Sequence, residues 1–386
     1  MKITAIRTTP LYCRLKQPYH WSHGVKEGAE IVLVEIETDT GVTGVGEVLG
    51  APNNAAKIAV IDYWRPAIVG SSAYDIKRLS ARCNQLGFVA NGAGSAPRYF
   101  AQCFAGIEFA LWDAIGKEHS LPVHKLLGGA VRDAVSYFGF IQGNTTDELA
   151  ASADEHNRKG YPVLYLKVGR GQDVDLANVK AVRETIGRRR LRLDANEKWD
   201  LLTAQRMIKL FSPFEIEMLE QPIPAAAGTA ALRRLQMRSP IPIAADQSVF
   251  TLGDVYSAIR DGAADLIVLG LHETGGIEGM IKAAGVGEAG AVNICNHAVF
   301  ESGITTCAFN QAAACIPNLD DGNQITSQLL EEDLITGPDL EPVSGNIPVI
   351  DGPGLGFDLA SNAVRRAADA YSKLHSGRYG FAVSET

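Results

Sequence analysis

The hydrophobic pattern of the first 125 residues predicts antiparallel strands followed by helices. Residues 30–38 alternate apolar and polar side chains like a half-buried strand, and Asp39-Thr40-Gly41 supplies a turn before a second strand over 42–48. Helical periodicity follows over the ranges 53–67, 75–86 and 101–117. An irregular segment at 17–28 and a loop at 87–95 interrupt the pattern. We therefore predict an α+β capping domain over residues 1–125.

From about residue 126, short β-branched runs alternate with helical stretches. This alternation predicts a parallel sheet with right-handed crossovers, and eight such units close into a barrel. The predicted fold class is thus α/β, a modified TIM barrel, (β/α)7β, over residues 126–354, with a tail from about 355 to 386 that returns to the capping domain. The expected strands lie near 135–141, 163–168, 191–194, 216–220, 241–245, 266–269, 292–295 and 325–330, and helices near 174–186, 203–211, 253–260 and 276–289.

Length and charge fit this picture. The chain has 386 residues and a net charge of −8 with interspersed acids and bases, so neither nucleic acid nor an anionic membrane is an expected partner. The first residues lack the apolar block of a signal peptide, no stretch is apolar enough to span a membrane, and six cysteines show no CxxC pair. We expect a cytoplasmic homo-oligomer with reduced thiols and a small-molecule partner.

Polar residues follow the predicted strand cores at a constant interval. Lys167 precedes Asp194 by 27 residues, and Glu220 and Asp246 follow at steps of 26. His297 comes 51 residues after Asp246, which is close to two further steps. A βα unit of a barrel takes roughly 25 to 30 residues, so these side chains are predicted at one height on the C-terminal rim, where barrel active sites lie.

Three buried carboxylates on neighbouring strands require a counter-charge. A hard divalent cation with oxygen ligands provides it, so Asp194, Glu220 and Asp246 are the predicted ligands of Mg²⁺. Asn196 is expected to support the same site. Zinc is disfavoured, since no His or Cys matches the spacing of the acids. The alternative is that each acid caps a helix.

Lys167 and His297 are predicted to flank the metal. A cation and partial burial would lower the pKa of Lys167 and make its amine a general base for a proton beside a carboxylate. His297 would act on the opposite face, and Glu301 would contact a substrate oxygen or hold His297. Alternatively, Lys167 forms a salt bridge with an acid, His297 is only hydrogen-bonded, and Glu301 is structural.

These residues, in this order, resemble the enolase superfamily, and within it the mandelate racemase and muconate lactonizing enzyme group. The resemblance covers nearly the whole chain. It implies Mg²⁺ on the three acids, abstraction of the α-proton by Lys167 and a metal-stabilised enediolate. The matching motifs are Leu166-Lys167-Val168-Gly169, Asp194-Ala195-Asn196, Leu219-Glu220-Gln221-Pro222, Ala245-Asp246-Gln247-Ser248, Gly275-Gly276, Glu301-Ser302-Gly303-Ile304 and the closing Asp351-Gly352-Pro353-Gly354-Leu355-Gly356.

Two departures from the family pattern concern the catalytic groups. Tyr165 replaces the first lysine of the K-x-K pair and is included among the candidate catalytic residues. Gly270 stands where the sixth strand often carries a lysine or aspartate, which argues against a two-lysine epimerase and leaves His272 or Glu273 as substitutes.

The resemblance favours an isomerase of the racemase or cycloisomerase type acting on a small carboxylic acid. A dehydratase of a hydroxy acid or sugar acid is the alternative lyase, and a barrel glycosidase or a catalytically silent binding protein also fit the residues. His20, Trp21 and His23 of the irregular segment, with the loop 87–95, are expected to cover the barrel mouth and select the substrate. Trp21 could instead be packed between the domains.

Overall fold

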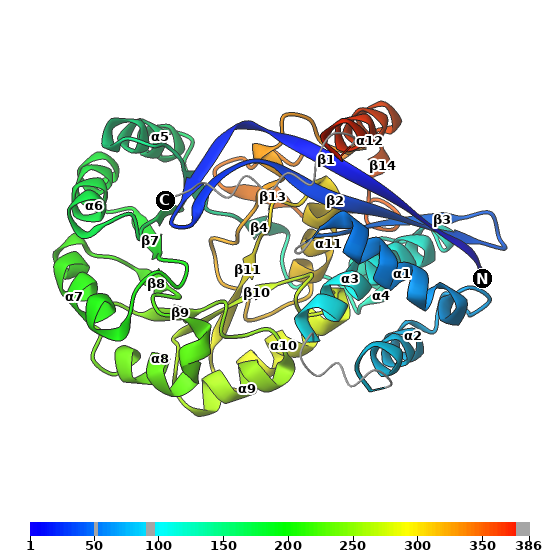
Figure 1. The fold of residues 1–386 in the computed structure, drawn as a ribbon, viewed down its shortest axis with the longest axis horizontal. Helices are drawn as coiled ribbons and strands as arrows, with labels where there is room; N and C mark the ends of the chain where they lie inside the picture. Colours follow the sequence, from blue (N-terminus) through cyan, green and yellow to red (C-terminus); the bar gives the residue numbers. More distant parts are fainter. Residues whose placement is uncertain (50–52, 90–96, 376–386) are drawn as a thin grey trace.

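The computed structural model describes residues 1–49, 53–89 and 97–375, and its two parts are an N-terminal sheet with helices and a barrel (Figure 1). The N-terminal sheet is antiparallel, in the order β1 (Ile3–Trp21), β2 (Gly24–Thr38), β3 (Thr43–Val48). The segment 17–28, expected to be irregular, is therefore the end of a long β1–β2 hairpin. A register shift between Arg14 and Tyr19 accounts for its broken alternation.

The helices of the N-terminal part are α1 (Asn54–Ile68), α2 (Ile76–Asn84), the π-helix Gln85–Val89, α3 (Pro97–Glu118) and the short α4 (Val123–Leu126). Of these, α1 and α3 pack against the sheet. Gly44 and Gly46 of β3 allow α3 to approach, because a Cβ atom at either position would lie within 2.0 Å of a carbonyl oxygen of α3. Of the predicted loop 87–95, residues 87–89 belong to the π-helix and the rest lie outside the described residues.

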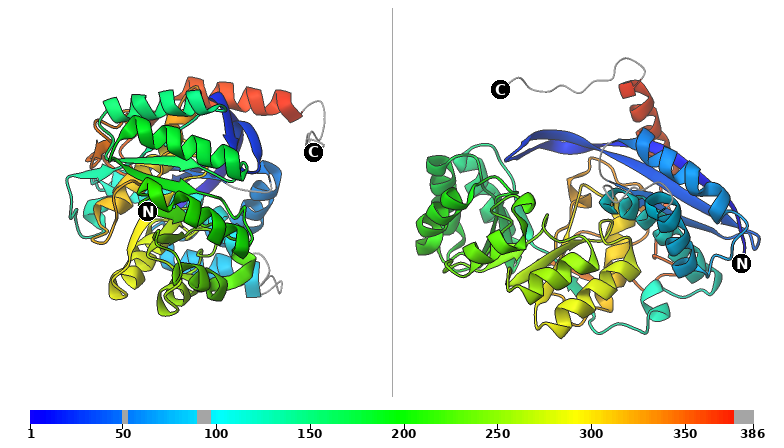
Figure 2. Two further views of the ribbon diagram at one scale, coloured as in Figure 1. Left: turned by 90° about the vertical axis from the view of Figure 1, so that its left-hand side faces the viewer. Right: turned by 60° about the horizontal axis from the view of Figure 1, so that its bottom comes forward.

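Seven parallel strands, at seven of the eight predicted places, form the curled sheet of the barrel. Each strand is followed by a helix, and the helices cover the outer side of the sheet (Figures 1 and 2). The strands are β5 (Gly139–Ile141), β6 (Val163–Lys167), β7 (Arg190–Asp194), β8 (Met218–Glu220), β9 (Ile243–Ala245), β10 (Leu266–Gly270) and β11 (Asn293–His297). The helices are α5 (Thr146–Arg158), α6 (Gln172–Ile186), α7 (Leu201–Phe211), α8 (Gly228–Gln236), α9 (Leu252–Arg260), α10 (Ile277–Ala289) and α11 (Gly303–Ala314).

The eighth strand predicted near 325–330 is wrong. The chain closes the barrel earlier, through single bridges from Leu319 to Ile294 and from Asn323 to Tyr137. Gly322, with φ +70°, and the side chain of Asn323, which donates to two backbone carbonyls, interrupt a regular ladder here. Residues 327–329 form a 3-10 turn instead.

The first barrel strand is shorter than predicted. Residues 135–141 split into β4 (Ala134–Ser136), which pairs antiparallel with β13 (Asn346–Pro348), and β5, which belongs to the barrel. The break falls at Tyr137 and Phe138, whose N–H groups donate to the carbonyls of Gly345 and Asn323.

A buried arginine joins the barrel wall to the closing segment. Arg192 of β7 is 1% exposed and pairs with Asp320 of that segment and with Glu217, at 3.1 Å, just before β8. Burial alone would lower the pKa of Arg192, but these carboxylates raise it, so the guanidinium stays charged. The network therefore connects β7 and β8 with the eighth barrel position.

Carboxylates of the N-terminal part hold the first turns of two barrel helices. Glu47 of β3 accepts hydrogen bonds from the Ser302 N–H at 3.1 Å and the Thr305 N–H at 3.0 Å, at the start of α11. Glu108 of α3 accepts from the N–H groups of Ile277 and Glu278, both at 3.0 Å, at the start of α10. These N–H groups have no hydrogen-bond acceptors within their own helices, so Glu47 and Glu108 supply the acceptors at both helix starts.

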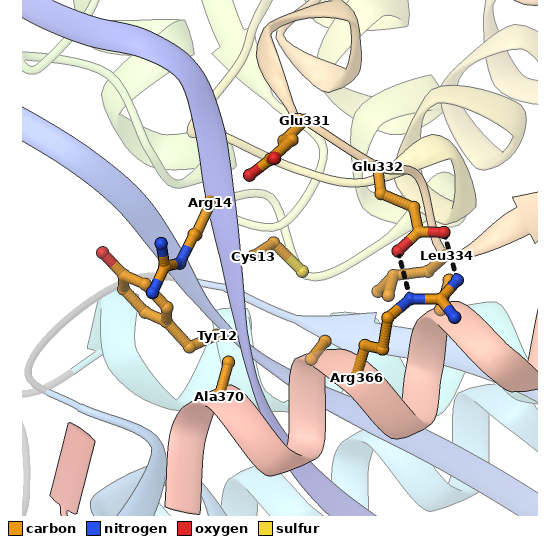
Figure 3. A pocket seen from close by; sticks show the side chains of 10 residues that line it. Tyr12, Cys13, Arg14, Glu331, Glu332, Leu334, Arg366 and Ala370 are labelled. Carbon is orange, nitrogen blue, oxygen red and sulfur yellow. Dashed lines mark hydrogen bonds and ion pairs between the residues drawn. The ribbon is translucent and has the colours of Figure 1, made fainter. Parts of the chain in front are cut away.

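The C-terminal region returns to the N-terminal sheet. After β12 (Ile335–Thr336) and β14 (Asp358–Leu359), α12 (Ser361–His375) lies along β1 (Figure 1). Between them is a cavity of about 590 Å³, lined by Cys13, Arg14 and Glu331, where Arg366 of α12 pairs with Glu332 (Figure 3). The strand-end carboxylates do not line this cavity.

Two further expectations concern cysteines and membranes. All six cysteines are free and five are buried. Among the described residues, no helix has both the length and the hydropathy that a bilayer crossing needs.

The Arg192 network predicts a specific loss of stability. Arg192→Met should lower the free energy of unfolding by about 2–4 kcal/mol, somewhat below the cost of breaking a fully buried ion pair, because Asp320 and Glu217 keep partial access to water. Arg366→Met removes an exposed pair and should cost less than about 1 kcal/mol. Urea unfolding measures both, and equal losses would contradict a special role for Arg192.

The carboxylates between the two parts predict a pH dependence. Burial raises the pKa of both Glu47 and Glu108 to about 7, although the hydrogen-bond donors around each carboxylate oppose this. Between pH 4.5 and 7 the folded state therefore binds more protons than the unfolded chain, and these two groups make stability fall as pH rises. Glu108→Gln should flatten this fall in urea unfolding relative to wild type. The exposed Glu288→Gln should leave the slope unchanged, and equal slopes in all three proteins would refute the assignment.

Candidate active site

The strand-end residues lie side by side on the barrel rim. Lys167 is the ladder neighbour of Asp194, and Asp194 is the neighbour of Glu220. Asp246 follows β9 directly, and His297 ends β11 beside Gly270 of β10. The three carboxylates are each at most 1% exposed. Parallel strands and equal spacing thus bring together the residues singled out in the sequence.

Asp194 is held by protein groups. Its Oδ2 accepts hydrogen bonds from the Lys167 ammonium and, at 2.6 Å, from the Tyr165 hydroxyl, and its Oδ1 accepts from the Asn196 N–H at 2.7 Å. Lys167 therefore forms a salt bridge with an acid, which was the alternative to the role of general base in the sequence-based prediction. Tyr165 is a hydrogen-bond donor where a lysine would add a second positive charge.

His297 lies closer to the acids than its position in the sequence suggests. Ligand atoms of Glu220, Asp246 and His297 all lie within 4.8 Å of one another. His297 Nδ1 is 3.2 Å from Asp246 Oδ1, and the other oxygen of Asp246 is buried with no hydrogen-bond partner. The protein thus leaves one carboxylate oxygen of the cluster unsatisfied.

Burial and neighbouring charges together determine the pKa values of the site. Burial, followed by Asp194 and Asp246, raises the pKa of Glu220 well above its usual value. Burial would lower the pKa of Lys167, but Asp194, Tyr19 and Glu220 raise it. Among protein groups alone, the effect on Lys167 is opposite to the lowered pKa expected from the sequence, because Asp194 contacts the ammonium directly. Burial would likewise lower the pKa of His297. Asp246 and Glu273 outweigh burial and raise this pKa to about 10.

The residues of this cluster fit a divalent cation. The three acids bring buried carboxylate oxygens together, one of them without a hydrogen-bond partner, and carboxylate oxygens are the ligands that Mg²⁺ prefers. Asp194, Glu220 and Asp246 could hold such an ion, and His297 lies near enough to compete with Asp194 as a ligand.

The loop after β10 carries both candidate substitutes for a sixth-strand group, and their side chains point in different directions. His272 is turned away from the cluster, with Nε2 2.9 Å from the carbonyl oxygen of Glu47, and burial lowers its pKa to about 4. Glu273 faces the cluster, with Oε1 3.9 Å from His297 Nε2.

Glu301 and Asn196 support loops. Both oxygens of Glu301 accept backbone N–H groups, from Val299 at 2.8 Å and Thr326 at 3.2 Å, which matches the structural alternative. Asn196 has a left-handed backbone, φ +45°, and its side-chain oxygen is buried with no hydrogen-bond partner. Such strained residues are typical of preorganised sites.

The end of the β1–β2 hairpin reaches over the barrel (Figure 2). His23 Nε2 lies 2.8 Å from the Asn196 carbonyl oxygen, and Trp21 packs edge-on against His23. His20 lines a small pocket together with Lys167 and Arg170. The hairpin therefore covers the β6 and β7 side of the mouth, and His20 is the member of the trio that shares a pocket with Lys167.

Two residues of the site were not predicted from the sequence. Tyr19 is buried beside Lys167, stacks on Phe140 at 5.5 Å and contacts Phe300 edge-on at 4.8 Å. Gln324 Nε2 donates to Tyr165 Oη at 3.4 Å and Glu220 Oε1 at 3.3 Å. A correct placement of the eighth barrel position would have singled out Gln324, whereas nothing in the sequence distinguishes Tyr19.

Comparisons with known proteins agree with this architecture. Residues 2–128 match the family "Mandelate racemase / muconate lactonizing enzyme, N-terminal domain" and residues 148–363 match "Enolase C-terminal domain-like". The chloromuconate cycloisomerase of Cupriavidus pinatubonensis is 32% identical over 89% of this chain and 92% of its own length.

Solved structures of related enzymes superimpose on nearly the whole chain. The muconate lactonizing enzyme of Pseudomonas fluorescens complexed with muconolactone is 27% identical, has a TM-score of 0.87, and is matched over 95% of this chain and 99% of its own. The dipeptide epimerase of Enterococcus faecalis V583, complexed with Mg and L-Leu-L-Tyr, is also 27% identical, with a TM-score of 0.84 and coverage of 93% and 100%. With matches at both levels across both parts of the fold, the chain belongs to the mandelate racemase and muconate lactonizing enzyme group of the enolase superfamily.

Proposed function

We propose that this protein is a Mg²⁺-dependent isomerase that removes the proton on the carbon next to a substrate carboxylate. The observation that carries the proposal is the position of Lys167 and His297 on β6 and β11, on either side of the acids of β7, β8 and β9. A substrate bound over the acids would present one face to each group.

Lys167 is the proposed base. The contact with Asp194 orients its nitrogen toward the carboxylate cluster. Loss of one proton from the ammonium to solvent, which is favoured when a cation is bound, would give the neutral amine that then accepts the α-proton. Asp194, Glu220 and Asp246 would hold the metal. When bound, a divalent cation would neutralise these acids and the charge that develops on the substrate carboxylate as its proton leaves.

His297 is the proposed second proton-transfer group. Its imidazole is partly buried between Asp246 and Glu273, which keeps it near the cluster. Tyr19, which lies beside Lys167, packs against Phe140 and Phe300, and these rings would exclude water and favour a substrate with an apolar body.

The relatives support isomerisation over the other reactions considered. The cycloisomerase, lactonizing enzyme and epimerase reported above are isomerases, so dehydration of a hydroxy acid or sugar acid is not favoured. Membership of the enolase superfamily likewise disfavours a glycosidase. We propose a small carboxylic acid as substrate and a homo-oligomer as the assembly.

Solvent exchange tests the proposed base. Lys167→Ala should lower deuterium incorporation from D₂O into L-Leu-L-Tyr or muconolactone at least about 100-fold with Mg²⁺ present, because the α-proton loses its acceptor. Lys167→Arg tests whether a folded cationic variant is equally impaired, and the exposed Lys180→Ala is the matched control. NMR measures the exchange. Wild-type exchange in Lys167→Ala would contradict the proposal, and so would a wild-type protein inert toward a broad acid library.

Titration calorimetry tests the metal ligands. Asp194→Asn, Glu220→Gln and Asp246→Asn should each weaken Mg²⁺ binding at least tenfold, about 1.4 kcal/mol, since each removes one anionic oxygen ligand. The exposed Asp173→Asn should bind Mg²⁺ as wild type does. Tight binding in Asp194→Asn together with weak binding in His297→Asn would show that histidine takes the place of that aspartate.

A further inference from the structure

Gly270, at the end of the sixth barrel strand, has no side chain and leaves space for the side chain of another residue. It is the ladder neighbour of His297, so a side chain at this position would stand beside the imidazole. A Cβ atom at Gly270 would lie 2.4 Å from Glu273 Oε2 and 2.8 Å from its Cδ. The carboxylate of Glu273 therefore occupies the space that a sixth-strand side chain would fill.

A tight turn returns Glu273 to this place. The Thr274 N–H donates to the Gly270 carbonyl at 3.0 Å, its hydroxyl donates to the same oxygen at 3.1 Å, and the Gly276 N–H donates to Leu271 at 2.9 Å. His272 attaches the turn to the N-terminal part through the Glu47 carbonyl. These hydrogen bonds thus fix the turn that carries Glu273.

Glu273 and Asp246 address opposite nitrogens of one imidazole. Asp246 Oδ1 lies 3.2 Å from Nδ1, and Glu273 Oε1 lies 3.9 Å from Nε2. Glu273 is 8% exposed, and among the described residues no lysine or arginine lies within 4.0 Å of its carboxylate. A buried carboxylate with this geometry has His297 as its sole ion-pair partner in the described chain.

We propose that Glu273 is the positioning residue of His297, supplied by the loop after the sixth strand in place of a side chain at Gly270. It restrains the imidazole plane from the Nε2 side. This leaves Nδ1, which is buried on the side of Asp246 with no hydrogen-bond partner, as the nitrogen that would exchange a proton with the substrate opposite Lys167. This inference rests on the proposed function, since it concerns the second proton-transfer group of the same site.

Kinetics test the role, with solvent exchange as the internal reference. Glu273→Gln keeps the size of the side chain and removes its charge. It should lower kcat for isomerisation about 10- to 100-fold while KM stays near the wild-type value and Lys167-dependent exchange in D₂O persists. Gly270→Ala should give a similar loss by displacing the carboxylate. In a Glu273→Ala background, Gly270→Ala should cost nothing more. The exposed Glu288→Gln is the matched control.

A spectroscopic measurement makes the test independent of substrate. In ¹⁵N-histidine-labelled protein, Glu273→Gln should shift the imidazole signals of His297, assigned by their loss in His297→Asn, and leave those of the distant His119 and His156 in place. Unmoved His297 signals, or wild-type kcat in Glu273→Gln, would overturn the role of Glu273. Absence of exchange in wild type would instead defeat the proposed function, and the NMR result would still decide whether Glu273 holds His297.

Discussion

Repulsion among three buried carboxylates is the constraint on which the rest of this structure depends. Asp194, Glu220 and Asp246 are enclosed at the ends of adjacent strands, where burial and the like charge of its two neighbours raise the pKa of Glu220. Lys167 at one end of the row and His297 at the other provide positive charge from the protein. The orphaned oxygen of Asp246 shows that they do not satisfy the cluster completely. The proposed cation and the proposed proton-transfer roles of Lys167 and His297 thus rest on one electrostatic arrangement.

The N-terminal part contributes to this site by holding the helices that follow strands β10 and β11 of the barrel. Glu108 binds the start of α10, which follows β10, and Glu47 binds the start of α11, which follows β11. These are the two strands whose ends carry Gly270 and His297. On the opposite side, the β1–β2 hairpin brings Tyr19 and His20 to Lys167. Union of the two parts therefore fixes the loops on both faces of the proposed substrate position.

Regular spacing made much of the fold and site predictable from sequence. A repeat of 26 or 27 residues placed Lys167, Asp194 and Glu220 on one rim because each βα unit advances by one strand. The closing segment was misplaced because Gly322 and the side chain of Asn323 replace a ladder by single bridges, which leaves no β-branched run to detect. The roles of Tyr19 and Gln324 depend on contacts between distant segments, which local pattern does not encode. Glu273 was one of two substitutes that the sequence offered, and only the structure distinguishes it from His272. The opposite sense of the Lys167 pKa shift has the same cause, since it follows from the direct contact with Asp194.

The central claim is that one cation joins three strand ends between two proton-transfer groups. A crystal structure with Mn²⁺, located by its anomalous signal, tests this most directly. The account predicts one ion with an oxygen of each of Asp194, Glu220 and Asp246 at about 2.0–2.2 Å, and Lys167 and His297 on opposite sides of it. An ion bound to a nitrogen of His297 with Asp194 still on Lys167, or no ion among these acids, would contradict it.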